Sequence, residues 1–325
     1  MPTALGRLRA RVLTPSVTAT SLDERGFHRK SPEAQELLET VGRRFLEGYG
    51  HAVGARSTTE AEDRLEAIEQ RFRGFAYEGA GMGAAMLDGL PGLGRGHVDR
   101  LLAGRGGPHE YMVYVGVGWA MARLPRACWP DVGALDPLLR WLVLDGYGFH
   151  QAYFRTERYV GGQYRDPRFP WPAHDHPDYA ANAVDQGVGR ALWFVCGTDA
   201  DLVATAVAQF PASRRRDLYS GVGLAATYAG GCTERELTVL RERGGEHRGA
   251  LAQGSAFAAE ARLRAGLHVA HTALATRVLC GMEPEEAAAV TQEVRPRGTS
   301  AGPLPAYEVW RRAIAARITG ATEPR

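Results

Sequence analysis

The sequence predicts an all-α protein of tandem helical-hairpin repeats, arranged as an open solenoid or as a curved, nearly closed α/α stack. A Gly-x-Gly element recurs about six times, with its first glycines at positions 79, 116, 146, 187, 221 and 254; the last copy, Gly254-Ser255-Ala256, is degenerate. The steps are 37, 30, 41, 34 and 33 residues, and a period of about 35 residues is typical of a two-helix repeat unit. No segment shows the apolar–polar alternation and β-branched enrichment of strands.

Composition and charge narrow the class of protein. The chain has 325 residues, of which 45% are hydrophobic and 23% are charged, so it is long enough to bury a large core. Its net charge of +2 argues against a nucleic-acid partner, because such proteins carry a strongly basic face. The N-terminus lacks the apolar segment of a secretory signal, and no apolar run reaches the roughly 20 residues of a membrane span. We therefore expect a cytoplasmic protein.

The four cysteines are widely spaced and form no CxxC pair. This spacing predicts reduced, buried thiols and no zinc ribbon or redox motif.

The chain divides into an N-terminal arm, residues 1–30, and a single helical-repeat domain, residues 31–325. The first helix is expected to begin after Ser31, because serine caps a helix and the proline that follows suits the first helical position. A second helix is expected to open near Thr59, where a capping-box pattern precedes an apolar stripe. Closing helices are expected from about residue 267.

The Gly-x-Gly elements lie inside the predicted helices. Glycine in a helix interior costs about 1 kcal/mol relative to alanine, so its recurrence needs a reason. We expect it to allow the backbones of neighbouring helices to approach closely. The alternative is that the glycines thin the helix wall beside a ligand. A dinucleotide-binding loop is rejected, because no copy follows a predicted strand.

Four long strings resemble one bacterial family: GFAYEGAGMGAAMLDGL, YMVYVGVGWAMARLP, LRWLVLDGYGFHQAYF and DLYSGVGLAATYAGG. This family is a domain of unknown function whose members include proteins encoded beside the iterative polyketide synthases of actinobacterial enediyne clusters. The resemblance runs from about Gly26 to Ile318. It implies an accessory protein of enediyne biosynthesis, a pathway to natural-product antibiotics. Its ligand would be a polyene or polyyne polyketide intermediate, and other enediyne pathway enzymes would be further partners.

Polar residues beside the glycine pairs are the candidates for catalysis. His150 is suited to act as a general base, with Asp145 or Glu78 as the carboxylate that orients it. Asp185 and Arg190 flank the next glycine pair and are further candidates. Asp145 and His150 are five positions apart, so contact between them is not implied. The alternative is that these side chains satisfy helix ends and hydrogen bonds between helices. No organic cofactor is expected.

Candidate substrate-binding residues come from the same helices. Gln186 and Gln253 precede glycine pairs, whereas Tyr147, Trp119 and Tyr228 belong to a dense aromatic set. Most aromatic residues should lie in the core, but a subset that lines a groove would suit a long, flat, unsaturated ligand.

A weaker alternative is a metal oxygenase. His174 and His176 flank an aspartate, and such a cluster can bind iron or zinc. It lies in the proline-rich stretch RDPRFPWPAHDHPDY, however, where a polar surface loop is the more common outcome. We therefore expect no metal.

Two kinds of function remain open. The first is an enzyme that modifies the nascent polyketide in a hydrophobic groove lined by the repeat helices. The second is a non-catalytic scaffold or carrier that binds the intermediate or partner enzymes, as helical-repeat proteins commonly do. A change in the mass of the bound polyene would indicate catalysis.

Overall fold

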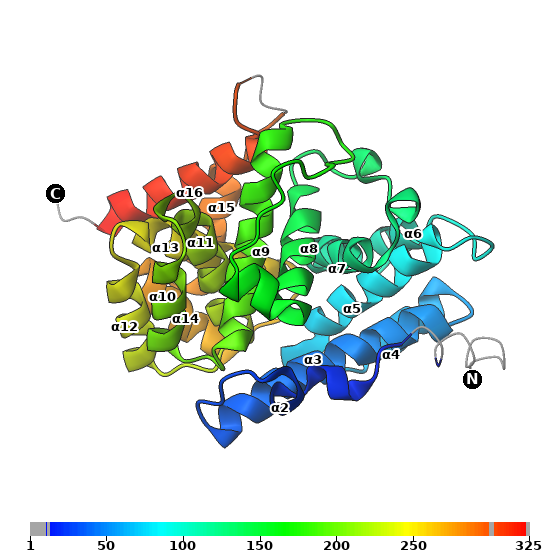
Figure 1. Cartoon of the computed structure of the whole chain (residues 1–325), viewed down its shortest axis with the longest axis horizontal. Coiled ribbons are helices and arrows are strands. Elements are labelled where there is room, and N and C mark those ends of the chain that lie inside the picture. Colours follow the sequence, from blue (N-terminus) through cyan, green and yellow to red (C-terminus); the bar gives the residue numbers. More distant parts are fainter. Residues whose placement is uncertain (1–10, 12–13, 299–301, 323–325) are drawn as a thin grey trace.

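The computed structural model describes residues 11, 14–298 and 302–322 (Figure 1). These residues form helices and no strand, which confirms the all-α prediction. None of the described helices is both long enough and apolar enough to span a bilayer. Of the predicted N-terminal arm, residues 1–10 and 12–13 lie outside the described residues.

The α-helices are α2 (Leu22–Arg25), α3 (Pro32–Gly54), α4 (Thr58–Glu66), α5 (Gln70–Gly89), α6 (His97–Ala103), α7 (Glu110–Arg123), α8 (Trp141–Phe154), α9 (Ala180–Val195), α10 (Ala200–Gln209), α11 (Ala212–Ala229), α12 (Glu234–Gly244), α13 (Arg248–Arg264), α14 (Ala270–Cys280), α15 (Pro284–Glu293) and α16 (Ala306–Thr322). Shorter turns are η1 (Val17–Thr20), η2 (Gly107–His109), η3 (Arg126–Cys128), η4 (Val132–Ala134), η5 (Glu157–Gly161), η6 (Pro177–Tyr179) and η7 (Gly245–His247).

The first two long elements begin close to where the sequence predicts. The hydroxyl of Ser31 accepts a hydrogen bond from the backbone N–H of Ala34 and caps α3. The cap of α4 is Ser57, not Thr59, and α4 ends at Glu66. The predicted apolar stripe is therefore shared between α4 and α5.

Five helices carry the glycine pairs, namely α5, α7, α8, α9 and α11, and α13 carries the degenerate sixth copy with the single glycine Gly254. Each packs against the next in chain order, and α5 also packs against α3. Residues two positions apart project about 200° apart around a helix. One glycine of each pair therefore faces the preceding helix, and the other faces the following helix.

Helix α9 shows the geometry. A Cβ on Gly187 would lie 1.9 Å from the carbonyl oxygen of Asp145 in α8. A Cβ on Gly189 would lie 2.1 Å from the carbonyl oxygen of Leu218 in α11. Both neighbours are backbone atoms, which no change of rotamer moves away. The prediction that the glycines allow close backbone approach is confirmed.

The connecting segments differ along the row. Helices α10, α12 and α14 pack on one another beside the glycine helices (Figure 1). By contrast, η3 and η4 follow α7, and η5 and η6 follow α8. These two connections contain Pro125, Pro130 and Pro137, and Pro167, Pro170 and Pro172, respectively. Proline removes a backbone donor and clashes with the preceding turn, so these stretches cannot form regular helices. The closing helices expected from the sequence are α14, α15 and α16.

Side chains connect the early and late helices of the row. Arg262 of α13 donates from Nη1 to the carbonyl oxygen of Arg71 in α5, at 3.1 Å. Phe75 of α5 packs edge-on against Tyr228 of α11, with ring centroids 5.1 Å apart. Helix α5 therefore contacts both α11 and α13.

Candidate active site

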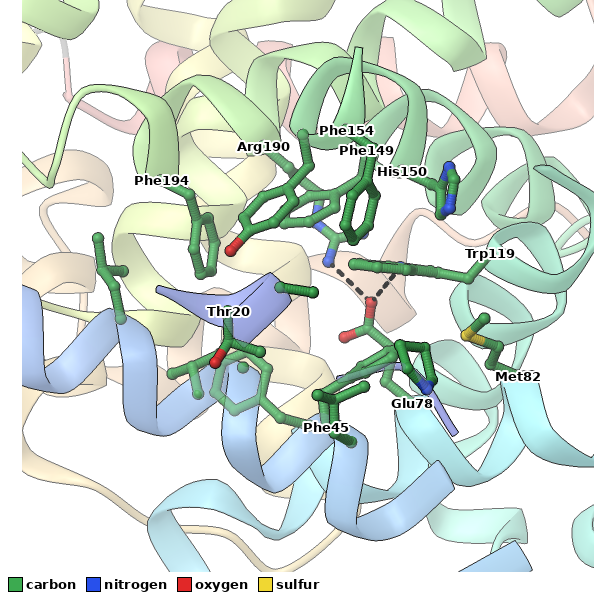
Figure 2. A pocket seen from close by; sticks show the side chains of 18 of the residues that line it. Thr20, Phe45, Glu78, Met82, Trp119, Phe149, His150, Phe154, Arg190 and Phe194 are labelled. Atoms are coloured by element: carbon green, nitrogen blue, oxygen red, sulfur yellow. Dashed lines mark hydrogen bonds and ion pairs between the residues drawn. The ribbon is translucent and has the colours of Figure 1, made fainter. Parts of the chain in front are cut away.

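An aromatic cavity lies among α3, α5, α7, α8 and α9, with about 60 Å³ of free space (Figure 2). That is room for a few water molecules. Its aromatic lining consists of Phe45, Phe75, Trp119, Phe149, Tyr153, Phe154 and Phe194. Among the described residues, the only acid that lines it is Glu78.

The N-terminal segment forms one wall of this cavity. Pro15, Ala19 and Thr20 line it, and the guanidinium of Arg25 lies 4.9 Å from the ring centroid of Phe154. Leu22 in α2 is buried in the core. Residues 14–30 therefore pack into the body of the protein and close the cavity on one side.

Glu78 belongs to a buried polar cluster drawn from four helices. Trp119 donates its indole N–H to Glu78 Oε1 at 3.0 Å, and Arg190 Nη2 lies 3.5 Å from the same oxygen. Arg190 Nη1 also donates to Asp145 Oδ1. Gln186 donates to Asp145 Oδ2 at 2.8 Å. The Arg190 guanidinium is therefore shared between two carboxyl groups.

Because Arg190 is shared with Asp145, it only partly compensates the negative charge of ionised Glu78. Burial raises the pKa of Glu78 to about 7, while Arg190 lowers it and the negative charge of Asp145 raises it. Trp119 and Arg190 both donate to Oε1, so we expect the proton of the neutral form on Oε2. Figure 2 shows this second oxygen pointing away from both donors and into the cavity. Glu78 is thus placed to give or take a proton at neutral pH.

His150 lines the same cavity without a carboxylate partner. Its ring packs edge-on against Trp119 at 5.5 Å and lies 4.7 Å from Phe154, measured between centroids. Its Nδ1 is buried without a hydrogen bond. Burial, together with the nearby Arg123 and Arg155, lowers the pKa of His150 to about 3. The imidazole is therefore neutral at pH 7. The structure places Asp145 against Arg190 and Gln186, not against His150.

Six of the ten predicted site residues do not line the cavity. Asp145 and Gln186 belong to the polar cluster beside it, Tyr228 lines a second cavity, and the other three lie away from both. Asp185 accepts two hydrogen bonds from Arg214, at 3.0 and 2.6 Å. Gln253 accepts a hydrogen bond from Ser220 at 2.7 Å. Tyr147 is half-buried and packs against aromatic rings in the connecting segments. None of the three lines the cavity.

A second, smaller apolar cavity of about 30 Å³ lies on the other side of Arg190, which lines both. Tyr228 lines it together with Tyr307 and Trp310 of α16. Burial raises the pKa of Tyr228 to about 12. Gln186 hydrogen-bonds Tyr307 at 3.1 Å and so connects the polar cluster to α16.

The proposed metal cluster lies in a surface loop. His174 is exposed and His176 is half-buried. The carboxylate of Asp175 between them accepts hydrogen bonds from Arg140 at 2.6 Å and from Trp171 at 2.9 Å. Across residues 11, 14–298 and 302–322, no group of three or more His, Cys, Asp and Glu side chains could hold a metal ion.

Sequence reasoning did not single out several residues that line the cavity, such as Phe45 and Phe75. A signal existed for Phe75, which lies three positions before Glu78 and therefore on the same helix face. Phe194 lies four positions after Arg190 and shares its face in the same way. Phe45 comes from α3, which precedes the repeats, and no spacing relates it to Glu78.

These features define a helical protein with a buried acid in an aromatic cavity. A model described as "Protein of unknown function (DUF1702)" matches residues 4–318, so the chain belongs to the DUF1702 family. Neither the search of curated proteins nor the search of solved structures finds a match.

Proposed function

We propose that this protein is an enzyme of enediyne biosynthesis that modifies a polyene or polyyne polyketide in the aromatic cavity. Glu78 is the proton donor, and no organic cofactor takes part. One observation carries the proposal. Glu78, the only acid among the described residues that line the cavity, is buried, has a pKa raised to about 7, and turns Oε2 toward the aromatic rings. The enediyne context rests on the sequence resemblance.

The proposal includes the architecture. The six Gly-x-Gly units form a curved stack of repeats that encloses the site. Its support is the contact of α5 with α11 and α13 through Phe75–Tyr228 and Arg262–Arg71. In such a stack, polar residues beside successive glycine pairs converge on one interior, as Glu78, Asp145 and Arg190 do here.

Proton transfer is the step that these side chains suit. A general acid works best when its pKa is near the working pH. After the proton leaves, Arg190 and Trp119 stabilise the Glu78 carboxylate, because both already donate to Oε1. Asp145 holds Arg190 in place from the other side.

The lining suits a flat, conjugated chain. Aromatic faces supply apolar contact area and few hydrogen-bonding groups. The free space of about 60 Å³ is too small for a long polyene. We therefore expect the wall formed by Pro15, Ala19 and Thr20 to move when the chain binds.

The experiment is turnover of the synthase-derived polyene by purified wild type and by Glu78→Gln. Product is followed by mass, retention time and absorption spectrum. Wild type should change the spectrum, whereas E78Q should bind the polyene and leave it unaltered. The matched control is Glu260→Gln, because burial also raises the pKa of Glu260 but this residue lines neither cavity.

Two outcomes contradict the proposal. E78Q that turns over the polyene at the wild-type rate removes Glu78 from catalysis. Wild type that binds the polyene tightly and returns it unchanged establishes the alternative, a non-catalytic carrier.

A further inference from the structure

The acid in the cavity is surrounded by aromatic faces. Trp119, which hydrogen-bonds Glu78, lies 4.4 Å from Phe45, 5.1 Å from Phe149 and 6.0 Å from Phe154, measured between ring centroids. The face of an aromatic ring is negative and attracts a cation, most strongly where water is excluded. A positive charge formed on a bound hydrocarbon chain would therefore be stabilised beside the acid.

The same cavity holds a weak base. His150 packs on Trp119 from one side of the ring system, and its Nδ1 has no hydrogen-bond partner. Its pKa of about 3 makes it neutral at pH 7. A C–H group on the carbon next to a carbocation is a very strong acid, so even this weak base suffices to remove its proton.

We infer that the site carries out a proton-initiated isomerisation or ring closure of an unsaturated hydrocarbon chain, through a carbocation held between the aromatic faces. This inference rests on the proposed function and names its reaction class. The observations behind it are the aromatic enclosure of Glu78, its free Oε2, and the unpartnered imidazole of His150.

The step balances without an oxidant or a reductant. The proton on Glu78 Oε2 adds to one carbon of a C=C bond, and the π electrons form the new C–H bond. The other carbon becomes cationic, either directly or after attack by a second C=C bond. His150 then removes a proton from the adjacent carbon, and that C–H pair forms the new C=C bond. Water takes the proton from His150 and restores the proton on Glu78, so the product has the composition of the substrate.

Several charged and titratable groups face Glu78 from the helices packed around it. They are Asp145 of α8, Arg190 of α9 and Tyr228 of α11, with Arg123 and His150 elsewhere on the cavity wall. Helix α3 contributes Phe45. Arg190 is shared between the two carboxyl groups, so ionisation of Glu78 makes the cluster more negative and more favourable to a cation.

The test uses a cation mimic, because it does not require the natural substrate. Benzyltrimethylammonium carries a fixed positive charge, and neopentylbenzene is its neutral isostere. Binding of each to the full-length protein is measured by calorimetry at pH 6 and pH 8. At pH 8, wild type should bind the ammonium at least about tenfold more tightly than the isostere. Its affinity for the ammonium should be lower at pH 6 than at pH 8. E78Q should lose the pH dependence.

Variants at Trp119 separate the aromatic face from the hydrogen bond. Trp119→Phe keeps a ring and should retain most of the preference for the cation, whereas Trp119→Leu should lose it. The circular dichroism spectrum and unfolding transition of each variant show whether it is folded. With substrate, turnover in D2O should give a product of unchanged composition that carries one carbon-bound deuterium.

Equal binding of the ammonium and the isostere by wild type at pH 8 overturns the carbocation inference, as does a product without deuterium. The proposed function survives either result if E78Q still fails to turn over the polyene. Full turnover of the polyene by E78Q overturns both the carbocation inference and the proposed function.

Discussion

Glu78 and Glu308 are two buried glutamates whose environments have opposite effects. Their exposed fractions are only 3% and 2%. Burial raises the pKa of Glu78 to about 7. Burial also acts to raise the pKa of Glu308, but Arg311, Arg216 and other donors outweigh it and lower this pKa to about 2.

The difference comes from the number of donors around each carboxyl group. Glu308 accepts hydrogen bonds from Arg311 at 3.0 Å, Arg312 at 2.7 Å and Tyr179 at 2.9 Å, and also from Arg216. Three guanidinium groups thus surround it. Glu78 receives one indole N–H and part of a guanidinium that Asp145 also uses.

The two sites therefore serve different purposes. Glu308 lies on α16, and its bonds to Arg216 and Tyr179 fasten that helix to the glycine helices. Glu78 lines the aromatic cavity, and the hydrogen bonds from Trp119 and Arg190 both go to its Oε1 and leave Oε2 to the cavity. A buried glutamate with several guanidinium partners stays ionised and holds helices together. A buried glutamate with few such partners can bind and release a proton near neutral pH.

The largest effect is expected from Glu308→Gln. Removing this charge takes the carboxylate partner from Arg216 and Arg312 and leaves Arg311 paired with Asp217. Loss of one partner of a buried ion pair costs about 3–5 kcal/mol. Because the folded-state pKa of Glu308 is below its unfolded value, its stabilisation is present above pH 4.5 and is lost as pH falls toward 2. Urea denaturation at pH 7 measures the loss.

Exposed Glu285 on α15 provides the control, and Glu285→Gln should leave the unfolding free energy at pH 7 unchanged. E308Q as stable as wild type would show that the arginines do not depend on Glu308.

Glu78→Gln should raise the unfolding free energy at pH 8, whereas Glu308→Gln should lower it at pH 7. The folded-state pKa of Glu78 is above its unfolded value, so wild type loses stability as pH rises from 4.5 and bears the full cost above about pH 7. Glutamine resembles the protonated form and avoids this cost. E78Q should therefore unfold at higher free energy than wild type at pH 8, by up to about 3 kcal/mol, and at equal free energy at pH 4. A loss of stability at pH 8 would contradict the comparison.

Sequence reasoning located one of these glutamates and not the other. Glu78 precedes a glycine pair, and repetition at a regular period marked that position and the equivalent Asp145 two glycine helices further on. Those two side chains do meet through Arg190. Glu308 lies on a helix outside the repeats, and its partner Arg216 is 92 positions away. No periodic signal relates them.

The same reasoning could not decide which flanking residues join the polar cluster around Glu78 and Arg190. Asp185 and Gln186 are neighbours in sequence, but consecutive residues point about 100° apart on a helix. Gln186 therefore reaches Asp145, whereas Asp185 points in another direction and pairs with the buried Arg214. Because the polar pattern extends over both positions, only the packed arrangement of helices distinguishes them.

Trp119→Phe should give a smaller change that sharpens the account of Glu78. Trp119 Nε1–H lowers the pKa of Glu78 by hydrogen-bonding Oε1. Without this donor the pKa should rise further, and stability at pH 8 should fall by about 1 kcal/mol. The measurement is the unfolding free energy as a function of pH. The midpoint of the change caused by ionisation of Glu78 should move to higher pH.

Trp129→Phe is the matched control, because the indole of Trp129 donates to the Leu124 carbonyl oxygen outside the cavity. A midpoint that W119F leaves unmoved would mean that the indole N–H does not act on the charge of Glu78.

The smallest effect is expected from Arg312→Ala, which tests whether the number of guanidinium groups or their burial protects Glu308. The side chain of Arg312 is 57% exposed, whereas that of Arg311 is 1% exposed, although both contact the same carboxylate. Exposed ion pairs contribute about 0–1 kcal/mol because water already screens them. R312A should therefore lower the unfolding free energy at pH 7 by less than about 1 kcal/mol, with Arg317→Ala on the same helix as a surface control. A loss as large as that of E308Q would show that the exposed arginine, and not the buried pair, holds the charge of Glu308.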